Sequence, residues 1–236
     1  MTARAQVFDH LALGIGAGTD GISLELAAPL GSHVDVRAGY GMGVGLIGYT
    51  VKDLAIPEHP AARESRDVNV PLKINLGMSD ARLLFNIYPS ANKGFHFTVG
   101  AFLGSPCFVR GTLTDMPSDY DTTGFEEDGY LVRARDGKLV TELRASGLGG
   151  PGFAVKPYAG IGFGRAVSQD GRVSFCFDLG AMYQGKPGLW ADGESLTGRI
   201  EKVQLSQDEI GEAVEDYGKY AAFWPTLSFR LFVKLF

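Results

Sequence analysis

The charged residues that could do chemistry in this sequence stand singly, at alternate positions of segments that are otherwise apolar or rich in glycine. Alternate residues of an extended strand point to the same side, so we expect these charges to gather on one face of a sheet. Acids and bases on a closed face can neutralise one another or line a narrow polar path. The set consists of Glu25, Asp35, Arg37, Lys73, Lys156, Asp178 and Arg230.

No other group of residues predicts catalysis or ligand binding. The histidines lack the spacing of metal ligands, and no His–Ser pair is placed for a lipid hydrolase. They are His10, His33, His59 and His96. Two glycine fingerprints, at 16–21 and 43–48, resemble dinucleotide-binding loops. Such a loop must open a helix, whereas residues 22–28 continue with period-two alternation. We therefore expect no catalytic, cofactor or metal site, and we do not expect an enzyme.

Two segments, 153–168 and 172–184, define the elements that position the charges. Each alternates over more than ten residues, with aromatic and aliphatic side chains on one face. The other face is mostly glycine, with Lys156 in the first segment and Asp178 in the second. Such a face is a poor surface toward water. A membrane barrel explains both faces, because apolar residues meet lipid while small and polar ones line a narrow interior.

The same alternation predicts an antiparallel, all-β transmembrane barrel of about eight strands. They lie at about 9–17, 21–29, 33–47, 67–88, 94–105, 153–168, 172–184 and 223–236. The alternation changes phase at Ser79–Asp80, and we interpret this as a bulge within one long strand. If both phase changes are turns between strands and one loop contains an extra strand, the chain would instead form a closed barrel of ten strands.

The connections differ between the two ends of the predicted barrel. At one end all three connections are short, at 30–32, 89–93 and 169–171. At the other end three connections are long, at 48–66, 106–152 and 185–222, and one is the short turn at 18–20. Short periplasmic turns and long outer loops are typical of outer-membrane barrels. The pieces 107–113 and 138–145 predict a hairpin beyond the membrane. A capping box at Ser206 and Glu209 predicts one short amphipathic helix over 207–221.

Composition limits the remaining possibilities. The chain has 236 residues, 33 of them glycine, and a net charge of -5, which argues against a nucleic-acid partner. No run approaches the ~18 apolar residues of a membrane helix. Cys107 and Cys176 lie too far apart in sequence for a disulfide framework, so we expect free thiols. Ala3-Arg4-Ala5 has the form of an export cleavage site. We therefore interpret 1–8 as an N-terminal remnant or periplasmic lead, and 9–236 as a single barrel domain.

Several segments resemble the small outer-membrane β-barrel proteins of Gram-negative bacteria, in particular a poorly characterised, porin-like group. They are Leu83-Leu-Phe-Asn-Ile-Tyr-Pro89, Gly94-Phe-His-Phe97, Lys156-Pro-Tyr-Ala-Gly-Ile-Gly-Phe163, Phe177-Asp-Leu-Gly-Ala-Met-Tyr-Gln-Gly-Lys-Pro187 and Trp224-Pro-Thr-Leu-Ser-Phe-Arg-Leu-Phe-Val-Lys-Leu-Phe236. The resemblance implies a place in the outer membrane and contact with its lipid. It also implies recognition of the C-terminal strand, with its terminal aromatic residue, by the barrel-assembly machinery. By alternation, however, Phe236 falls on the same face as Lys234 and not on the apolar face that ends at Leu235. It implies no defined activity.

Three classes of function remain open. Our first prediction is a structural or interaction barrel that displays outer loops, with a protein partner at those loops and a lumen plugged by its charges. The second is a narrow channel for small solutes or ions. The third is a soluble ligand-binding barrel of the lipocalin type, against which the apolar outward faces argue.

Overall fold

The structure is a computed structural model, and it describes most of the chain. The described residues are 10–57, 65–115, 125–127, 130–132, 135–150, 152–169, 171–191, 194–195 and 222–236. The predicted N-terminal remnant and the predicted helix at 207–221 lie outside the described residues. Within these ranges the chain contains no helix, and none therefore that is long and apolar enough to cross a membrane.

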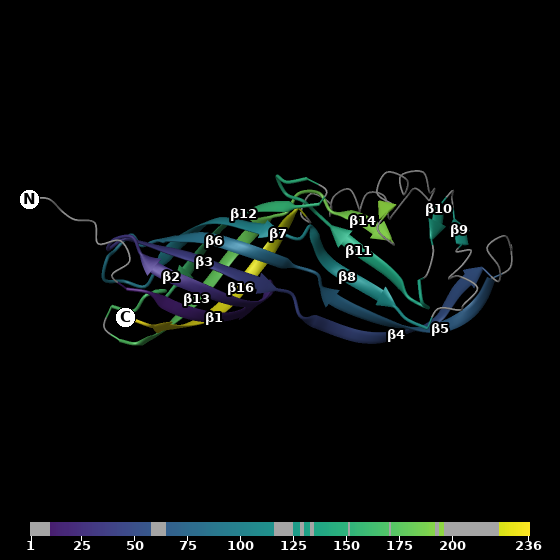
Figure 1. Cartoon of the computed structure of the whole chain (residues 1–236), viewed down its shortest axis with the longest axis horizontal. Helices are drawn as coiled ribbons and strands as arrows, with labels where there is room; N and C mark the ends of the chain where they lie inside the picture. The colour runs from purple at the N-terminus through teal and green to yellow at the C-terminus, as the bar shows by residue number, and fades with distance from the viewer. Residues whose placement is uncertain are drawn as a thin grey trace, which may run out of the picture.

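Eight antiparallel strands close into a barrel, which confirms the predicted fold (Figure 1). In their order around the barrel they are β1 (Ala12–Gly18), β16 (Phe223–Lys234), β13 (Val173–Tyr183), β12 (Ala154–Phe163), β7 (His96–Gly104), β6 (Ser79–Ile87), β3 (Val34–Met42) and β2 (Gly21–Pro29). The first strand pairs with the last, with Ile15 opposite Leu231, so the barrel has no free edge.

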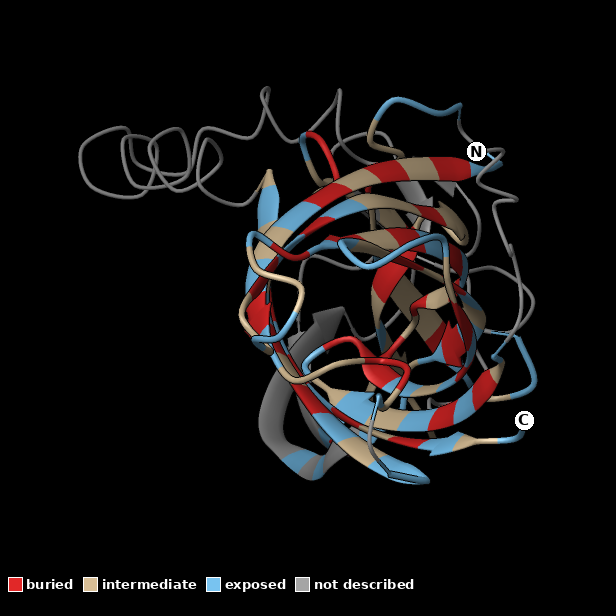
Figure 2. Ribbon diagram, turned by 90° about the vertical axis from the view of Figure 1, so that its left-hand side faces the viewer, coloured by how far each residue is buried: buried red, intermediate tan, exposed pale blue. Residues whose placement is uncertain are grey.

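Apolar side chains cover the outside of the barrel, as the alternation predicts. Ile15, Phe175 and Phe229 are 60%, 74% and 60% exposed. Figure 2, which looks along the barrel, shows buried and exposed residues alternating along each strand. Glycines on the inner face leave room for large neighbours, because a Cβ added at Gly14 would collide with the ring of Phe232.

A six-stranded antiparallel sheet extends beyond one end of the barrel (Figure 1). Its order is β15 (Glu194–Ser195), β14 (Gly188–Ala191), β11 (Leu139–Arg144), β8 (Cys107–Leu113), β5 (Ser65–Leu76) and β4 (Gly45–Pro57). The predicted hairpin of 107–113 with 138–145 is confirmed, since Leu139 pairs with Leu113. A separate two-stranded sheet joins β9 (Phe125–Glu127) to β10 (Tyr130–Val132).

The prediction of single strands over 33–47 and 67–88 is wrong, and so is that of a loop over all of 49–66. The chain leaves the barrel after β3, runs out along β4 and returns along β5 before it re-enters as β6. Residues 77 and 78 lie between β5 and β6 and belong to neither strand. The phase change at Ser79–Asp80 therefore marks a passage between two sheets and not a bulge within one strand.

The two ends of the barrel differ. The first and last described residues, His10 and Phe236, lie at the end with the short turns, and the six-stranded sheet lies at the other (Figure 1). At the terminal end, the turn after β12 folds inward and buries Ala166 and Val167. Arg165 of this turn donates hydrogen bonds to the carbonyls of Ser32 and Ala91, which belong to the other two turns.

Candidate functional site

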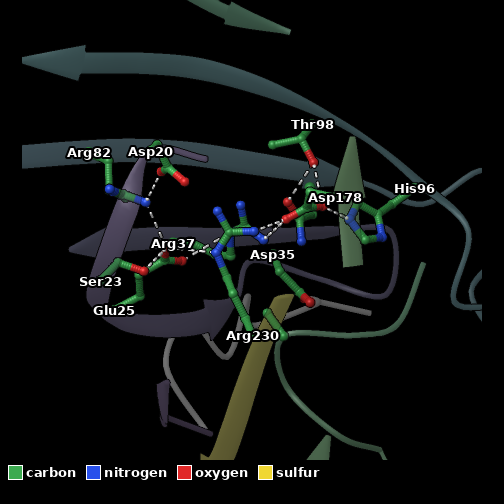
Figure 3. Close-up of polar contacts among 12 residues, drawn as sticks. Asp20, Ser23, Glu25, Asp35, Arg37, Arg82, His96, Thr98, Asp178 and Arg230 are labelled. Carbon is green, nitrogen blue, oxygen red and sulfur yellow. Dashed lines mark hydrogen bonds and ion pairs between the residues drawn. The ribbon is translucent and has the colours of Figure 1, made fainter. Parts of the chain in front are cut away.

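Charged side chains from opposite walls of the barrel meet at its centre around Asp178 (Figure 3). Its carboxylate accepts hydrogen bonds from Arg37 Nη1 at 2.8 Å and from Arg230 Nη1. His96 Nε2 lies 2.8 Å from the other carboxylate oxygen. Asp178, Arg37 and His96 are each 0% exposed. Three strands on the walls around Asp178, β3, β7 and β16, are thus tied to β13 through one carboxylate.

His96 has acceptors at both ring nitrogens. Its Nδ1 lies 3.0 Å from the carbonyl of Gly94, and its Nε2 faces Asp178. These two contacts fix the orientation of the ring between the backbone before β7 and the carboxylate of Asp178.

Glu25 continues the chain of alternating charges toward the six-stranded sheet. It accepts a hydrogen bond from Arg230 Nε at 2.8 Å and lies 3.5 Å from Arg37 Nε. Arg82 Nη1 lies 3.5 Å from Glu25 and donates at 2.8 Å to Asp20, in the turn between β1 and β2. The guanidinium of Arg82 also stacks on Phe102, 4.8 Å from the ring centroid. Acids and bases alternate along the whole series, which limits the cost of burying each charge.

Two further buried polar groups stand apart from this chain. Lys156 Nζ lies 3.1 and 3.2 Å from the two carboxylate oxygens of Asp80. Lys156 does not pair with Asp178, because the strand register places Gly162 opposite Asp178, six residues further along β12. Asp35 accepts a hydrogen bond from the Tyr88 hydroxyl at 2.9 Å, and Arg165 stacks on the Tyr88 ring.

The prediction that Lys73 lies in the lumen is wrong. Lys73 is exposed on β5, in the six-stranded sheet, because the chain has left the barrel at this point. The other six predicted residues lie on barrel strands with buried side chains, and four of them meet in the central cluster. The four are Glu25, Arg37, Asp178 and Arg230.

The prediction left several members of the lumen out. They are Asp20, Asp80, Arg82, Asn86, Tyr88, His96 and Thr98. Parity along β6 and β7 placed Arg82, His96 and Thr98 inward, so alternation could have found them. Asp20 belongs to a turn, and its pairing with Arg82 carries no sequence signal.

Apolar side chains fill the lumen on both sides of the charges. Toward the termini lie Ala12, Ala27, Ala166, Val167, Cys176 and Phe232. Toward the six-stranded sheet lie Leu76, Met78, Leu84, Phe102, Phe108, Ala145, Tyr158 and Met182, with Trp224 and Val109 against them. Cys107 and Cys176 are buried and unpaired. Among the residues that the structure describes, no cluster of His, Cys, Asp or Glu could hold a metal ion.

Comparison with known proteins supports the fold. The chain is similar to CarO2 of Acinetobacter baumannii, whose crystal structure superposes with a TM-score of 0.51 at 16% identity, over 97% of this chain and 99% of that one. CarO of the same organism gives a TM-score of 0.44 at 17% identity, over 94% and 96% of the two chains, and adds nothing to the argument. No protein-family model and no curated protein sequence matches the chain. At such low identity the likeness to CarO2 concerns the fold alone.

Proposed function

We propose that this chain is an integral outer-membrane barrel with a structural or interaction role, whose lumen is plugged by its charged network. The arrangement around Asp178 carries the proposal. Its carboxylate links β13 to β3, β7 and β16, so no continuous polar path passes between these walls without breaking ion pairs. Apolar clusters on both sides of the network add to the closure.

The outside of the barrel supports a place in the membrane and argues against a soluble, lipocalin-like barrel. Aliphatic and aromatic side chains with large exposed fractions lie on all eight strands; examples are Ile15, Leu24, Tyr40, Leu83, Phe97, Ile161, Phe175 and Phe229. A soluble monomer rarely exposes a continuous apolar surface of this size. In a membrane, the same surface faces acyl chains.

A narrow channel for small solutes or ions is the second candidate. One observation favours it: some buried polar atoms of the lumen have no hydrogen-bond partner among the described residues, including Arg37 Nη2 and Asp35 Oδ1. Buried polar atoms of this kind commonly bind ordered water. A few such waters would give the interior a partial polar path, although the ion pairs would still interrupt it.

The interaction role predicts that the six-stranded sheet lies outside the cell. An epitope inserted between Asp136 and Gly137, an exposed turn before β11, should bind antibody on intact cells. The same epitope at Ser32, in a turn at the terminal end, should bind only after permeabilisation. Heat-dependent gel mobility of both proteins in outer-membrane fractions would verify folding. Labelling of the Ser32 insertion alone on intact cells would invert the proposed orientation.

A further inference from the structure

A pocket of about 350 Å³ lies at the rim between the barrel and the six-stranded sheet. Two stretches form its walls: residues 144–147, where the chain leaves β11, and residues 184–188, between β13 and β14 (Figure 1). Trp190 of β14 completes the lining. Of its lining residues, Ala145 also belongs to the apolar cluster next to the six-stranded sheet, and none belongs to the charged network of the lumen.

Backbone hydrogen bonds hold the walls in place. The Gly147 N–H donates to the Gln184 carbonyl at 2.6 Å, which joins the two walls, and the Val155 N–H of β12 donates to the Ser146 carbonyl at 3.0 Å, which ties the first wall to the barrel. Gly147 and Gly185 have φ values of +60° and +77°, and a Cβ at Gly147 would collide with the Val155 carbonyl. The pocket is therefore built by the fold and not by surface side chains alone.

Two basic side chains line the pocket, Arg144 and Lys186. Arg144 is oriented on two sides: its guanidinium stacks on Trp190, 4.6 Å from the ring centroid, and it pairs with Glu142. Burial raises the pKa of Glu142, but the hydrogen bond from Arg144 and the charge of Arg110 outweigh it, and the net pKa is lowered. Glu142 is thus ionised at neutral pH and pairs with both Arg144 and Arg110. These two bases and one acid together keep one net positive charge. With Lys186, the pocket is cationic and suits an oxyanion.

The surroundings of the pocket indicate where that oxyanion would come from. Leu148 and Phe153, which follow the Gly147 wall, are 70% and 53% exposed. Both lie where the apolar outer surface of the barrel ends, next to β12. If the barrel spans the membrane, these side chains lie at the acyl boundary and the pocket lies at the level of the lipid headgroups.

We propose that this pocket binds the phosphate group of a membrane lipid at the outer rim of the barrel. The proposal rests on the membrane location argued above. Arg144 and Lys186 contact the phosphate oxygens, and Leu148 and Phe153 contact the acyl chains below. A guanidinium and an ammonium that converge on one anion are a common means of phosphate recognition.

Thermal unfolding of the folded, full chain in detergent tests the proposal, with lipid A and inorganic phosphate as probes. Lipid A should raise the unfolding temperature at concentrations at least tenfold below those of inorganic phosphate. Lys186→Gln and Arg144→Gln should each require about tenfold more lipid A for the same shift, the loss of roughly one charge-assisted hydrogen bond. Lys138→Gln, which removes an exposed lysine just before β11 and outside the pocket, should respond like the parent protein.

Each other outcome overturns the proposal. Equal potency of lipid A and inorganic phosphate would indicate a free anion as the ligand. An unchanged response in both pocket variants, or an equal loss in Lys138→Gln, would place the lipid elsewhere. These results would leave the membrane location intact, whereas a chain absent from outer-membrane fractions would refute that location separately.

Discussion

Asp178 joins four strands of the barrel, because four side chains from three other strands reach its two oxygens. They are Arg37, His96, Thr98 and Arg230. The inner wall is shaped around this group, since a Cβ at Gly162 would collide with both Asp178 and His96. An ionised acid here balances bases that would otherwise be buried alone, and removal of one member of such a set is costly.

Replacement Asp178→Asn should therefore destabilise the barrel while it keeps the volume of the side chain. Arg37 and Arg230 would lose their shared counter-charge, at a cost of about 3–5 kcal/mol. The unfolding temperature in detergent measures this loss. Thr98→Val is the control, because it removes only the 3.5 Å contact to Asp178 and the 3.1 Å bond to Asn86. A parent-like unfolding temperature for Asp178→Asn would show that the network contributes little.

At the residue scale, alternation predicts which charges face inward but not which of them meet. It placed Glu25, Arg37, Asp178 and Arg230 on the inner face, where the structure has them. Pairing depends on strand register, and register is set by contacts between segments far apart in sequence. Alternation places both Lys156 and Asp178 on the inner face of neighbouring strands, but Lys156 contacts Asp80.

At the scale of single elements, each barrel strand has one face for lipid and one for the lumen. Leu179, near the middle of β13, is 48% exposed. Leu143, on β11 of the six-stranded sheet, is 37% exposed. The two leucines are similar in exposure, but only the first lies on the surface that we assign to lipid.

Leu179→Arg should block assembly, because arginine on the lipid face near the midplane costs about 2–4 kcal/mol. Leu143→Arg, the matched control, should assemble, since that position lies outside the membrane. The fraction of each protein that shows heat-dependent gel mobility in outer-membrane extracts measures assembly. Normal assembly of both variants, or failure of both, would contradict the proposed boundary between membrane and sheet.

Strand β11 carries a pH-sensitive contact outside the membrane. The pKa of Glu142 is lowered from 4.5 by Arg144 and Arg110, although burial alone would raise it. A group with a lowered pKa in the folded state stabilises that state above the unfolded pKa and loses this effect as the pH falls. The Arg144–Glu142 pair should therefore weaken only below about pH 4.5.

Trp190 fluorescence reports this change, because Arg144 stacks on its ring. The other of the two tryptophans is replaced by Trp224→Phe. We expect an acid transition below pH 4.5 that disappears in Glu142→Gln. Persistence of the same transition in Glu142→Gln would assign it to other groups.

Sequence periodicity predicted six of the eight barrel strands within about five residues at each end, since each must bury one face and expose the other over its whole length. It placed β3 and β6 inside predicted strands that were too long. It did not predict β4 and the outer part of β5, and it did not separate β5 from β6. Residues 49–66 show no alternation in the sequence, yet residues 49–57 pair with residues 65–72 in the structure. In addition, β5 and β6 belong to different sheets but are separated by only two residues, so their sequence resembles that of one long strand.

At the scale of the whole molecule, side chains of three kinds occupy the lumen in successive layers. An apolar layer with Phe232 and Val167 lies at the terminal end, the charges lie at the centre, and a second apolar layer with Phe102 and Phe108 lies below the six-stranded sheet. An eight-stranded barrel is only wide enough for its own side chains. We therefore propose an anchored platform for the six-stranded sheet and not a pore.

Ion conductance in planar lipid bilayers tests the closed lumen most directly. The purified, folded parent protein should insert without steady single-channel currents. Asp178→Ala should remain closed as well or should unfold more readily, because its partners are left buried without their counter-charge. A parent protein that conducts steadily, and whose ion selectivity changes in Asp178→Ala without loss of stability, would contradict the plugged barrel and favour the channel.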